Sequence, residues 1–354
     1  MSGSSLDGLD IVFAELLHEA GRWSFEIKAA ECYPYSEEWR YKLQEATTLT
    51  ALDYQLLHTA YGHYIGEQVN RFIDEHQLHY QAALVASHGH TTFHLPAQRM
   101  TAQLGDGAAI AAQTKLPVVS DLRALDIAFG GQGAPIVPIG EQLLLPEYAL
   151  FLNLGGIANI SFHQNSAFHA YDVCPANRVL NLLCAPVQKE YDAGGAMAAM
   201  GQVNDEMLRS LNELSYYKQA FPKSLANSFG TEEILPLVRS FGLTHNDNLR
   251  TYVEHIVVQL RKALDLEGLP ANRRLLVTGG GAFNSFLIQR LTEELLELNM
   301  EVVVPDEQLV QYKEALVMAL IGVLRWRQEY NVLSSVTGAE RDSIGGAVWI
   351  GQEG

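Results

Sequence analysis

The chain has 354 residues, enough for about two domains, and its 48% hydrophobic and 18% charged residues are typical of a globular protein. A formal net charge of −17 without a basic stripe argues against nucleic acid as a partner. The sequence shows no secretory leader and no apolar run of membrane-spanning length, so we expect no membrane partner. Cys32, Cys174 and Cys184 lack metal-ligand or disulfide spacing, which favours a cytoplasmic location.

Strand and helix patterns alternate in the first third of the chain and predict a mixed α/β layer. In order, the pattern predicts strands at 10–17 and 24–30, a helix at 47–76, a strand at 82–86, a helix at 107–114 and a strand at 117–120. The segment 130–135 then combines flexible glycines with a helix-breaking proline. We expect a domain boundary there.

The rest of the chain reads as a second α/β unit. The pattern predicts a strand at 149–154, a hairpin partner at 157–162, helices within 179–201 and 248–266, a strand at 275–278, a helix at 286–298, a strand at 301–304 and a helix at 313–329. We therefore expect one domain at 1–134 plus about 337–354 and another at 135–336. Phosphate-binding turns in both halves predict a nucleotide cleft between the domains.

Three glycine-rich turns carry the strongest functional signal, because glycines after strands let the backbone approach an anion closely. The expected nucleotide contacts are Gly3, Ser4, Ser5, Leu6, Asp7, Gly8, Leu9 and Asp10 in the opening turn, Gly155 and Gly156 in the second, and Gly279, Gly280, Gly281 and Asn284 in the third. In the functional interpretation Asp7 lies near Mg²⁺ and contacts it through a water molecule. The alternatives are an ordinary Ser/Asp turn, close strand–helix packing, and helix capping by Asn284.

Asp172 is the candidate general base, since it follows the predicted hairpin and would face a cleft. An N-cap role for the following helix is an equally good interpretation. Asn177 and Cys174 are expected to orient neighbours or to pack, and Asn177 is also a candidate substrate contact. A catalytic Cys174 would need a paired base, which the sequence does not offer.

Three further side chains are candidates for substrate contacts or catalysis. His88 belongs to a histidine-rich stretch that favours hydrogen bonds to a sugar or phosphate over zinc. Arg123, flanked by two aspartates, would either fork onto a substrate carboxylate or form a structural ion-pair cluster. Glu314, expected at the start of a helix, would orient water or a hydroxyl, or would simply favour the helix dipole.

Together, these segments resemble the anhydro-N-acetylmuramic acid kinases of the hexokinase–Hsp70–actin superfold, along nearly the whole chain. The matching segments, in order, are 1–8, 87–89, 103–107, 121–135, 153–160, 191–201, 222–224, 279–284, 314–315 and 337–339. The resemblance implies a two-domain actin/hexokinase-like, ribonuclease H-like fold with ATP between the domains. It also implies a homodimer.

The chemistry implied by the resemblance is hydrolytic opening of the 1,6-anhydro ring of anhydro-N-acetylmuramic acid, with transfer of the γ-phosphoryl group of ATP to O6. The product, N-acetylmuramic acid 6-phosphate, belongs to peptidoglycan recycling. In this mapping Asp172 deprotonates the attacking water and Arg123 binds the lactyl carboxylate. ATP and Mg²⁺ are the implied cofactors.

The chain departs from the family pattern in three places. Val173, Cys174, Ala176 and Asn181 replace the usual residues around the base, and His90 stands where glutamine is usual. The family also has a short strand before the opening turn, whereas this sequence starts at Met1, so we expect flanking strands with unpaired backbone groups. These departures keep two alternatives open: a kinase of another amino sugar, and an ATP-binding regulatory protein without phosphotransfer.

Overall fold

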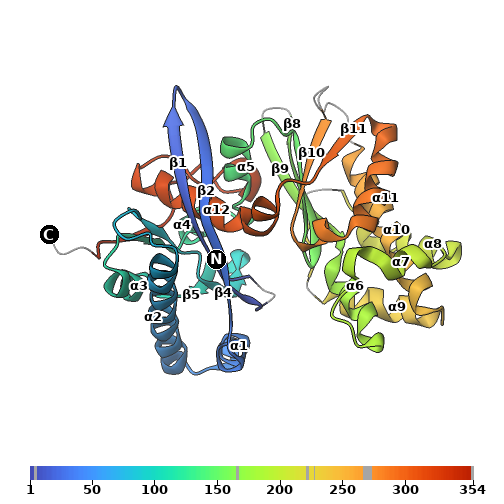
Figure 1. Ribbon diagram of the computed structural model, residues 1–354, viewed down its shortest axis with the longest axis horizontal. Coiled ribbons are helices and arrows are strands. Elements are labelled where there is room, and N and C mark those ends of the chain that lie inside the picture. The colour runs from blue at the N-terminus through green and yellow to red at the C-terminus, as the bar shows by residue number, and fades with distance from the viewer. Residues whose placement is uncertain (4–5, 165–166, 221–222, 227, 266–272, 352–354) are drawn as a thin grey trace. The chain divides into compact units, whose positions relative to one another are not determined.

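The protein is described by a computed structural model for residues 1–3, 6–164, 167–220, 223–226, 228–265 and 273–351. The chain divides into two compact units, Met1–Pro146 with Tyr312–Gly354, and Glu147–Gln311. Each unit combines helices with β-strands (Figure 1), which confirms the predicted α/β class with two units.

The unit boundaries differ from those predicted at 134 and 337. Helix α5 (Pro138–Leu144) belongs to the first unit because it packs on α12 (Glu307–Trp326), where Glu141 of α5 forms a buried ion pair of 2.7 Å with Lys313. Most of α12 therefore counts with the first unit. The glycine-rich segment 130–135 is a turn inside that unit rather than its end.

The first unit contains two hairpins, a three-stranded sheet and several helices. Its strands are β1 (Gly8–Glu19), β2 (Arg22–Pro34), β3 (Val85–Ala86), β4 (His90–Leu95), β5 (Met100–Leu104), β6 (Val118–Ser120) and β12 (Ala347–Trp349). Its helices, besides α5 and α12, are α1 (Glu37–Gln44), α2 (Ala51–Glu75), α3 (Gly107–Thr114), α4 (Ala124–Ala128) and α13 (Ser334–Thr337).

The described strands of this unit form three separate sheets. β1 and β2 form an antiparallel hairpin whose turn residues Ala20 and Gly21 both have positive φ, as a two-residue hairpin turn with the right twist requires. β4 and β5 form a second antiparallel hairpin, and the third sheet has the order β12-β6-β3. Within the described residues, β1 has only β2 as a neighbouring strand and β3 has only β6.

The long helix α2 carries the main core of the first unit. It begins after Thr50, whose hydroxyl accepts a hydrogen bond from the Asp53 backbone N–H, as an N-cap does. Its buried face repeats at helical spacing and packs against β1, β5 and α3. The buried side chains of that face include Leu57, Tyr61, Ile65, Val69 and Phe72.

The second unit is a five-stranded sheet with helices. Its strands are β7 (Leu150–Leu154), β8 (Ile157–Gln164), β9 (Ala167–Pro175), β10 (Arg273–Thr278) and β11 (Met300–Val303). Its α-helices are α6 (Asn177–Cys184), α7 (Ala196–Met200), α8 (Asp205–Asn212), α9 (Leu235–Ser240), α10 (His245–Leu264) and α11 (Ser285–Leu295). In the described part of either unit, no helix has the length and apolarity needed to span a bilayer.

The strand order β11-β10-β7-β8-β9 determines which turns share an edge of the sheet. β10 runs parallel to β7, while β8 is antiparallel to both β7 and β9. The strands β10, β7 and β9 therefore run in the same direction and end at one edge. Ligands of α/β sheets commonly bind outside such carboxyl ends.

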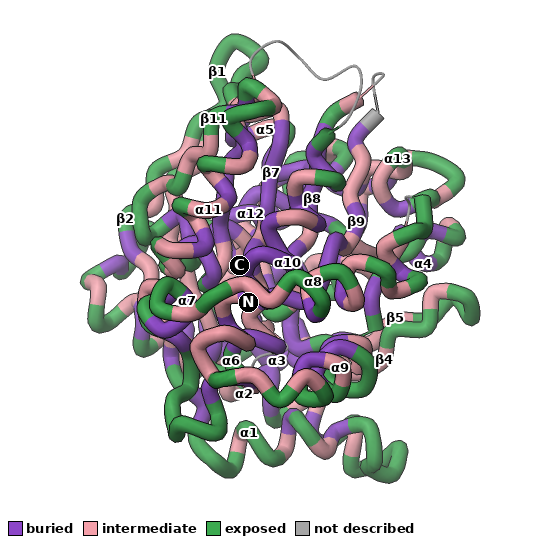
Figure 2. The backbone as a smooth tube through the Cα atoms, turned by 90° about the vertical axis from the view of Figure 1, so that its right-hand side faces the viewer, coloured by how far each residue is buried: buried purple, intermediate pink, exposed green. Residues whose placement is uncertain are grey.

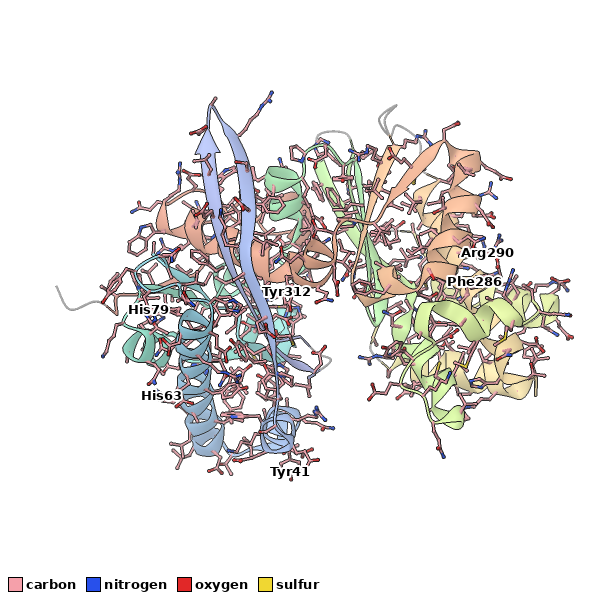
Figure 3. The ribbon with its side chains drawn as sticks, in the orientation of Figure 1. Tyr41, His63, His79, Phe286, Arg290 and Tyr312 are labelled. Carbon is pink, nitrogen blue, oxygen red and sulfur yellow. The ribbon has the colours of Figure 1, made fainter. Side chains whose placement is uncertain are left out.

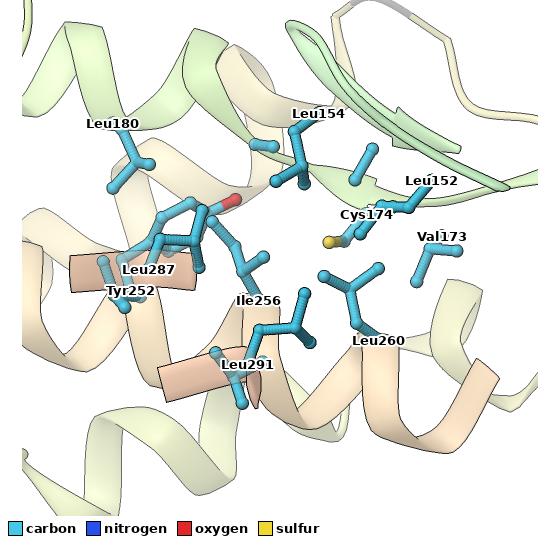
Figure 4. Close-up of a cluster of buried hydrophobic side chains, with 14 of the residues drawn as sticks. Leu152, Leu154, Val173, Cys174, Leu180, Tyr252, Ile256, Leu260, Leu287 and Leu291 are labelled. Carbon is cyan, nitrogen blue, oxygen red and sulfur yellow. The ribbon is translucent and has the colours of Figure 1, made fainter. Parts of the chain in front are cut away.

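A single apolar core holds the helices of this unit against its sheet. β7 and α10 are buried along most of their length (Figure 2). Leucines of both elements and of α11 meet in a cluster that includes Tyr252 and Cys174 (Figure 4). At the rim, α11 presents Phe286 and Arg290 (Figure 3), and Arg290 forms an ion pair of 2.7 Å with Glu254 of α10.

Candidate functional site

Two of the predicted nucleotide turns meet at the carboxyl edge of the second unit's sheet. The Gly155–Gly156 turn connects β7 to β8, and the Gly279–Gly281 turn follows β10. Asn177, the first residue of α6, lies between them. Its side-chain amide donates to the Leu154 carbonyl at 2.9 Å, and its backbone N–H donates to the Gly155 carbonyl at 3.1 Å. Asn177 therefore orients the Gly155–Gly156 turn, whether or not it also contacts a substrate.

Packing alone requires glycine at two positions of the third turn. Gly279 has a φ of +82°, and a Cβ there would lie 2.4 Å from the side-chain oxygen of Asn153. A Cβ on Gly281 would lie 2.7 Å from the Cβ of Leu154. The structural alternative, close packing of one turn on another, accounts for these two glycines.

Packing does not explain the other three glycines. A Cβ built on Gly155 would meet nothing closer than 3.5 Å, and on Gly156 or Gly280 nothing closer than 3.7 Å. None of the three has a positive φ that would demand glycine. Their backbones are thus open to the close approach of a ligand, which is what a phosphate-binding turn needs.

Asn284 serves as a helix cap. Its side-chain oxygen accepts a hydrogen bond of 3.0 Å from the Leu287 backbone N–H at the start of α11. The alternative of capping therefore describes this residue, and its oxygen is already used within the protein.

Asp172 lies inside β9, where it pairs with Asn159, and not in a loop after the hairpin. The N-cap alternative is wrong, because Ala176 occupies that position of α6 without a side-chain cap bond. Ser224 and Leu225, on a distant segment of the chain, hold the carboxylate instead. Its Oδ2 accepts from the Leu225 backbone N–H at 2.9 Å and from the Ser224 hydroxyl at 3.2 Å.

The surroundings of Asp172 suit a proton acceptor. Burial raises the pKa of its carboxyl group, while the hydrogen bonds from Leu225 and Ser224 lower it, and burial dominates. A carboxylate whose pKa rises towards neutrality is a better general base than an ordinary surface aspartate. Tyr216 fixes the backbone at the same point by donating to the Asp172 carbonyl at 2.6 Å.

Arg123 in the first unit is a buried cation held by neutral partners. Its Nε donates to His88 Nε2 at 2.8 Å, and its Nη1 donates to the Gly133 carbonyl at 2.6 Å. Burial lowers the pKa of Arg123 to about 10. Among the described residues no carboxylate forms a direct ion pair with Arg123, but the charges of Glu314 and Asp126 raise its pKa, so the predicted alternative of an ion-pair cluster is supported only as a longer-range interaction.

His88 binds Arg123 within the protein, and both of its ring nitrogens are used in protein hydrogen bonds. Burial and the adjacent guanidinium lower the pKa of His88 to about 3, so the ring is neutral. Its Nδ1 donates to the Gly89 carbonyl at 3.0 Å, which leaves Nε2 to accept from Arg123. Both ring nitrogens thus have protein partners, which differs from the direct substrate contact expected for His88.

Asp126, one of the two aspartates that flank Arg123 in the sequence, fixes the loop that holds Arg123. Its carboxylate accepts from the Gly133 backbone N–H and from the Thr337 hydroxyl, each at 2.7 Å. The side chain is 1% exposed. A cluster of acids around an arginine was visible in the sequence, but the partner Thr337 lies more than two hundred residues away.

The opening turn divides into structural and open parts. Ser4 and Ser5 lie outside the described residues, and the Leu6 backbone N–H donates to the Gly3 carbonyl at 3.4 Å. Gly8 is required by packing, since a Cβ would lie 2.6 Å from the sulfur of Cys32, and Leu9 is buried in the core. These two residues position the turn.

Ser2 anchors the turn through a contact that the sequence did not predict. Its hydroxyl bonds His90 Nδ1 at 3.0 Å and accepts from the Tyr35 hydroxyl at 2.8 Å. The unusual His90 therefore serves the opening turn.

Three acids, Asp7, Asp10 and Glu314, interact in the first unit. Burial raises the pKa of Asp10, and the charges of Asp7 and Glu314 raise it further. The described residues contain no group of three or more side chains that could enclose a metal ion. Mg²⁺ usually keeps several waters and uses only one or two carboxylates besides substrate phosphates, so Asp7 and Asp10 fit such an ion.

Glu314 lies two turns into α12 and not at its start. The helix begins at Glu307, so the predicted start at 313 missed its first two turns. The interpretation of Glu314 as an acid favoured by the helix dipole is therefore wrong, since that effect is confined to the first turn. Its charge instead acts on Arg123 and Asp10.

Comparisons with known proteins identify the same family along nearly the whole chain. The family model described as anhydro-N-acetylmuramic acid kinase matches residues 1–351. An anhydro-N-acetylmuramic acid kinase from Vibrio vulnificus strain YJ016 is 32% identical over 96% of this chain and 94% of its own length. One from Synechococcus elongatus is 32% identical over 99% of this chain and 98% of its own.

Similarity to solved structures is weaker. A ROK family glucokinase from Streptomyces griseus, solved with glucose and AMPPNP, has a TM-score of 0.40 and 10% identity, covering 88% of this chain and 99% of that one. At this distance the similarity carries no argument about the site.

Proposed function

Because this chain belongs to the anhydro-N-acetylmuramic acid kinase family, a family of ATP-binding carbohydrate kinases, we propose that Asp172 is the base of its reaction. The reaction would open the 1,6-anhydro ring with water and move the γ-phosphoryl group of ATP to O6. The observation that carries the proposal is a partly buried carboxylate of raised pKa, held by two hydrogen bonds in β9 near the carboxyl edge of the sheet.

Asp172 takes a proton from water as the water oxygen bonds to the anomeric carbon and the bond from that carbon to O6 breaks. O6 then bonds to the γ-phosphorus, and ADP leaves with the electrons of the broken P–O bond. The products are ADP and N-acetylmuramic acid 6-phosphate, which is used in peptidoglycan recycling.

Gly155, Gly156 and Gly280 are the proposed backbone contacts of the ATP phosphates, since a ligand can approach them closely. Asp7 and Asp10 would hold a hydrated Mg²⁺, which neutralises phosphate charge when bound. Ser4 and Ser5, outside the described residues, stay predicted contacts of the same nucleotide.

Arg123 is the proposed partner of the lactyl carboxylate of the sugar. Its guanidinium is buried, charged and without an ion-pair partner among the described side chains, so an incoming carboxylate would find an oriented donor. His88 would position it, and Glu314 would orient a substrate hydroxyl.

We also propose a cytoplasmic location, where ATP is supplied and the free cysteines Cys32, Cys174 and Cys184 stay reduced. The homodimer implied by the family stays a prediction.

The test is sugar-dependent release of ADP in water enriched in ¹⁸O, with the Asp172→Asn variant alongside. The wild type should place one ¹⁸O on the anomeric carbon and none in the phosphoryl group, because water attacks carbon and O6 attacks phosphorus. Asp172→Asn should lose turnover by about 10²-fold or more, as expected for removal of a general base.

Asp205→Asn, an exposed acid at the start of α8, is the matched control and should keep full activity. Unlabelled sugar, or ¹⁸O in the phosphate, would contradict the proposed steps. Turnover with a different amino sugar from a panel, and none with the anhydro sugar, would favour the alternative kinase. Binding of ATP without any sugar-dependent turnover would favour the regulatory protein.

A further inference from the structure

The opening turn of the first unit is a loop that is held at both of its ends. Ser2 and Leu9 form an antiparallel bridge, which closes the loop that contains Gly3, Asp7 and Gly8. Leu9 is buried in the apolar core of the unit. Ser2, at the other end, is polar and only 3% exposed, so its hydroxyl needs hydrogen bonds within the protein.

Ser2 receives those hydrogen bonds from two sides. His90 Nδ1 lies 3.0 Å from the Ser2 hydroxyl oxygen. On the other side, the Tyr35 hydroxyl donates to Ser2 at 2.8 Å and is itself hydrogen-bonded to the Tyr61 hydroxyl at 2.5 Å. All four side chains are buried. Because water cannot readily replace a lost partner there, each hydrogen bond of this network matters for the position of Ser2.

His90 belongs to a rigid part of the unit. It is the first residue of β4 and pairs with Leu104 of β5, which is fully buried. The preceding Gly89 has a φ of +69°, and a Cβ at that position would collide with the Leu104 carbonyl. The backbone at 89–90 is therefore tightly constrained, and it places the imidazole of His90 against the opening turn.

The same short stretch also supports Arg123. His88, two residues before His90, accepts from Arg123 Nε at 2.8 Å, and its own Nδ1 donates to the Gly89 carbonyl. One histidine thus holds the proposed partner of the sugar carboxylate, and the other holds the start of the predicted nucleotide turn. In a chain of net charge −17, overall attraction does not bring in phosphate groups, so their binding depends on how the turn is placed.

We propose that His90 is a positioning residue for the nucleotide, which acts by holding Ser2 and thereby the opening turn. The inference rests on the proposed function, because it requires that the opening turn binds ATP. A residue at position 90 should then serve only if it offers a hydrogen-bonding atom where His90 has Nδ1. An asparagine side chain has an oxygen or nitrogen at the same distance from the backbone, whereas a leucine side chain has only carbon there.

Calorimetry with Mg²⁺ and a non-hydrolysable ATP analogue tests this role. His90→Leu should weaken nucleotide binding by about three- to tenfold, as expected for the loss of one buried hydrogen bond, and should leave binding of the anhydro sugar unchanged. His90→Asn should bind the nucleotide as tightly as the wild type. His79→Gln, at an exposed histidine beside Asp74, is the matched control and should change neither affinity (Figure 3).

A double-mutant cycle tests whether the effect passes through Ser2. Ser2→Ala should weaken nucleotide binding about as much as His90→Leu, and the two changes together should weaken it no further. Ser2→Ala removes a single oxygen atom, so it tests the same hydrogen bond should His90→Leu fail to fold.

Three results would overturn the inference while the proposed function stands: additive losses in the double variant, weak binding by His90→Asn, or an equal loss of sugar binding in His90→Leu. Full nucleotide affinity in both His90→Leu and Ser2→Ala would overturn it as well. A wild type that binds the sugar but no nucleotide would overturn the inference and the proposed function together.

Discussion

Replacement of Ser224 by alanine tests the proposed base through its pKa. The Ser224 hydroxyl stabilises the charged form of Asp172 over 3.2 Å, so its loss should raise the pKa of Asp172 above the already raised native value. A hydrogen bond to a charged group contributes about 1.5–3 kcal/mol. Because Ser224 is exposed and water can replace part of the bond, we expect about 1 kcal/mol to be lost.

One pKa unit corresponds to about 1.4 kcal/mol, so the expected rise is between about half a unit and one unit. The base must be ionised to act, and activity is therefore lost as pH falls through this pKa. The acid limb of kcat/KM against pH should move upward by that amount, with little change in the plateau.

The assay is sugar-dependent ADP release over a range of pH. Ser240→Ala is the matched control, since that exposed hydroxyl donates to the Leu237 carbonyl within α9 and has no hydrogen bond to Asp172. An acid limb that stays in place in Ser224→Ala, with Ser240→Ala unchanged, would refute the assignment of Asp172 as the titrating base.

Two other predictions concern the ligands. Gly155→Ala should fold with an unchanged melting temperature yet weaken ATP binding by about tenfold or more, measured by calorimetry, whereas Gly279→Ala should cost about 1–3 kcal/mol of stability because of its φ and its contact with Asn153. Loss of stability in Gly155→Ala would mean that packing needs that glycine after all. Arg123→Lys, which loses the fork held by His88, should raise KM for the anhydro sugar by about tenfold or more but not for its lactyl amide. An equal effect on both sugars would argue against a carboxylate contact.

Local patterns predicted much of the fold. The helix at 107–114 has the predicted bounds, and the strands β7 and β10 differ from their predicted ranges by two residues at most. These segments were predictable because their helical periodicity or apolar run depends only on residues adjacent in the chain. The predicted start of α12 missed residues 307–312, although Leu309, Val310 and Tyr312 already follow the helical spacing.

The site was harder to predict because its contacts join distant segments. Asp172 becomes part of β9 only through its pairing with β8, and its partner Ser224 comes fifty-two residues later. Arg123 reaches back thirty-five residues to His88. Sequence spacing identified Asp172 and Arg123 as candidates, but not which neighbours hold them.

The neutral partners of Arg123 have a thermodynamic consequence. Folding orders this side chain and removes its charge from water, and the charges of Glu314 and Asp126 offset part of that cost without a direct ion pair. An anion that reaches the guanidinium therefore binds to a group that needs no rearrangement, and its binding energy adds to the folding energy of the first unit by linkage. Such a site makes the unliganded protein less stable than it need be, and it couples resistance to heat directly to the supply of an anionic ligand.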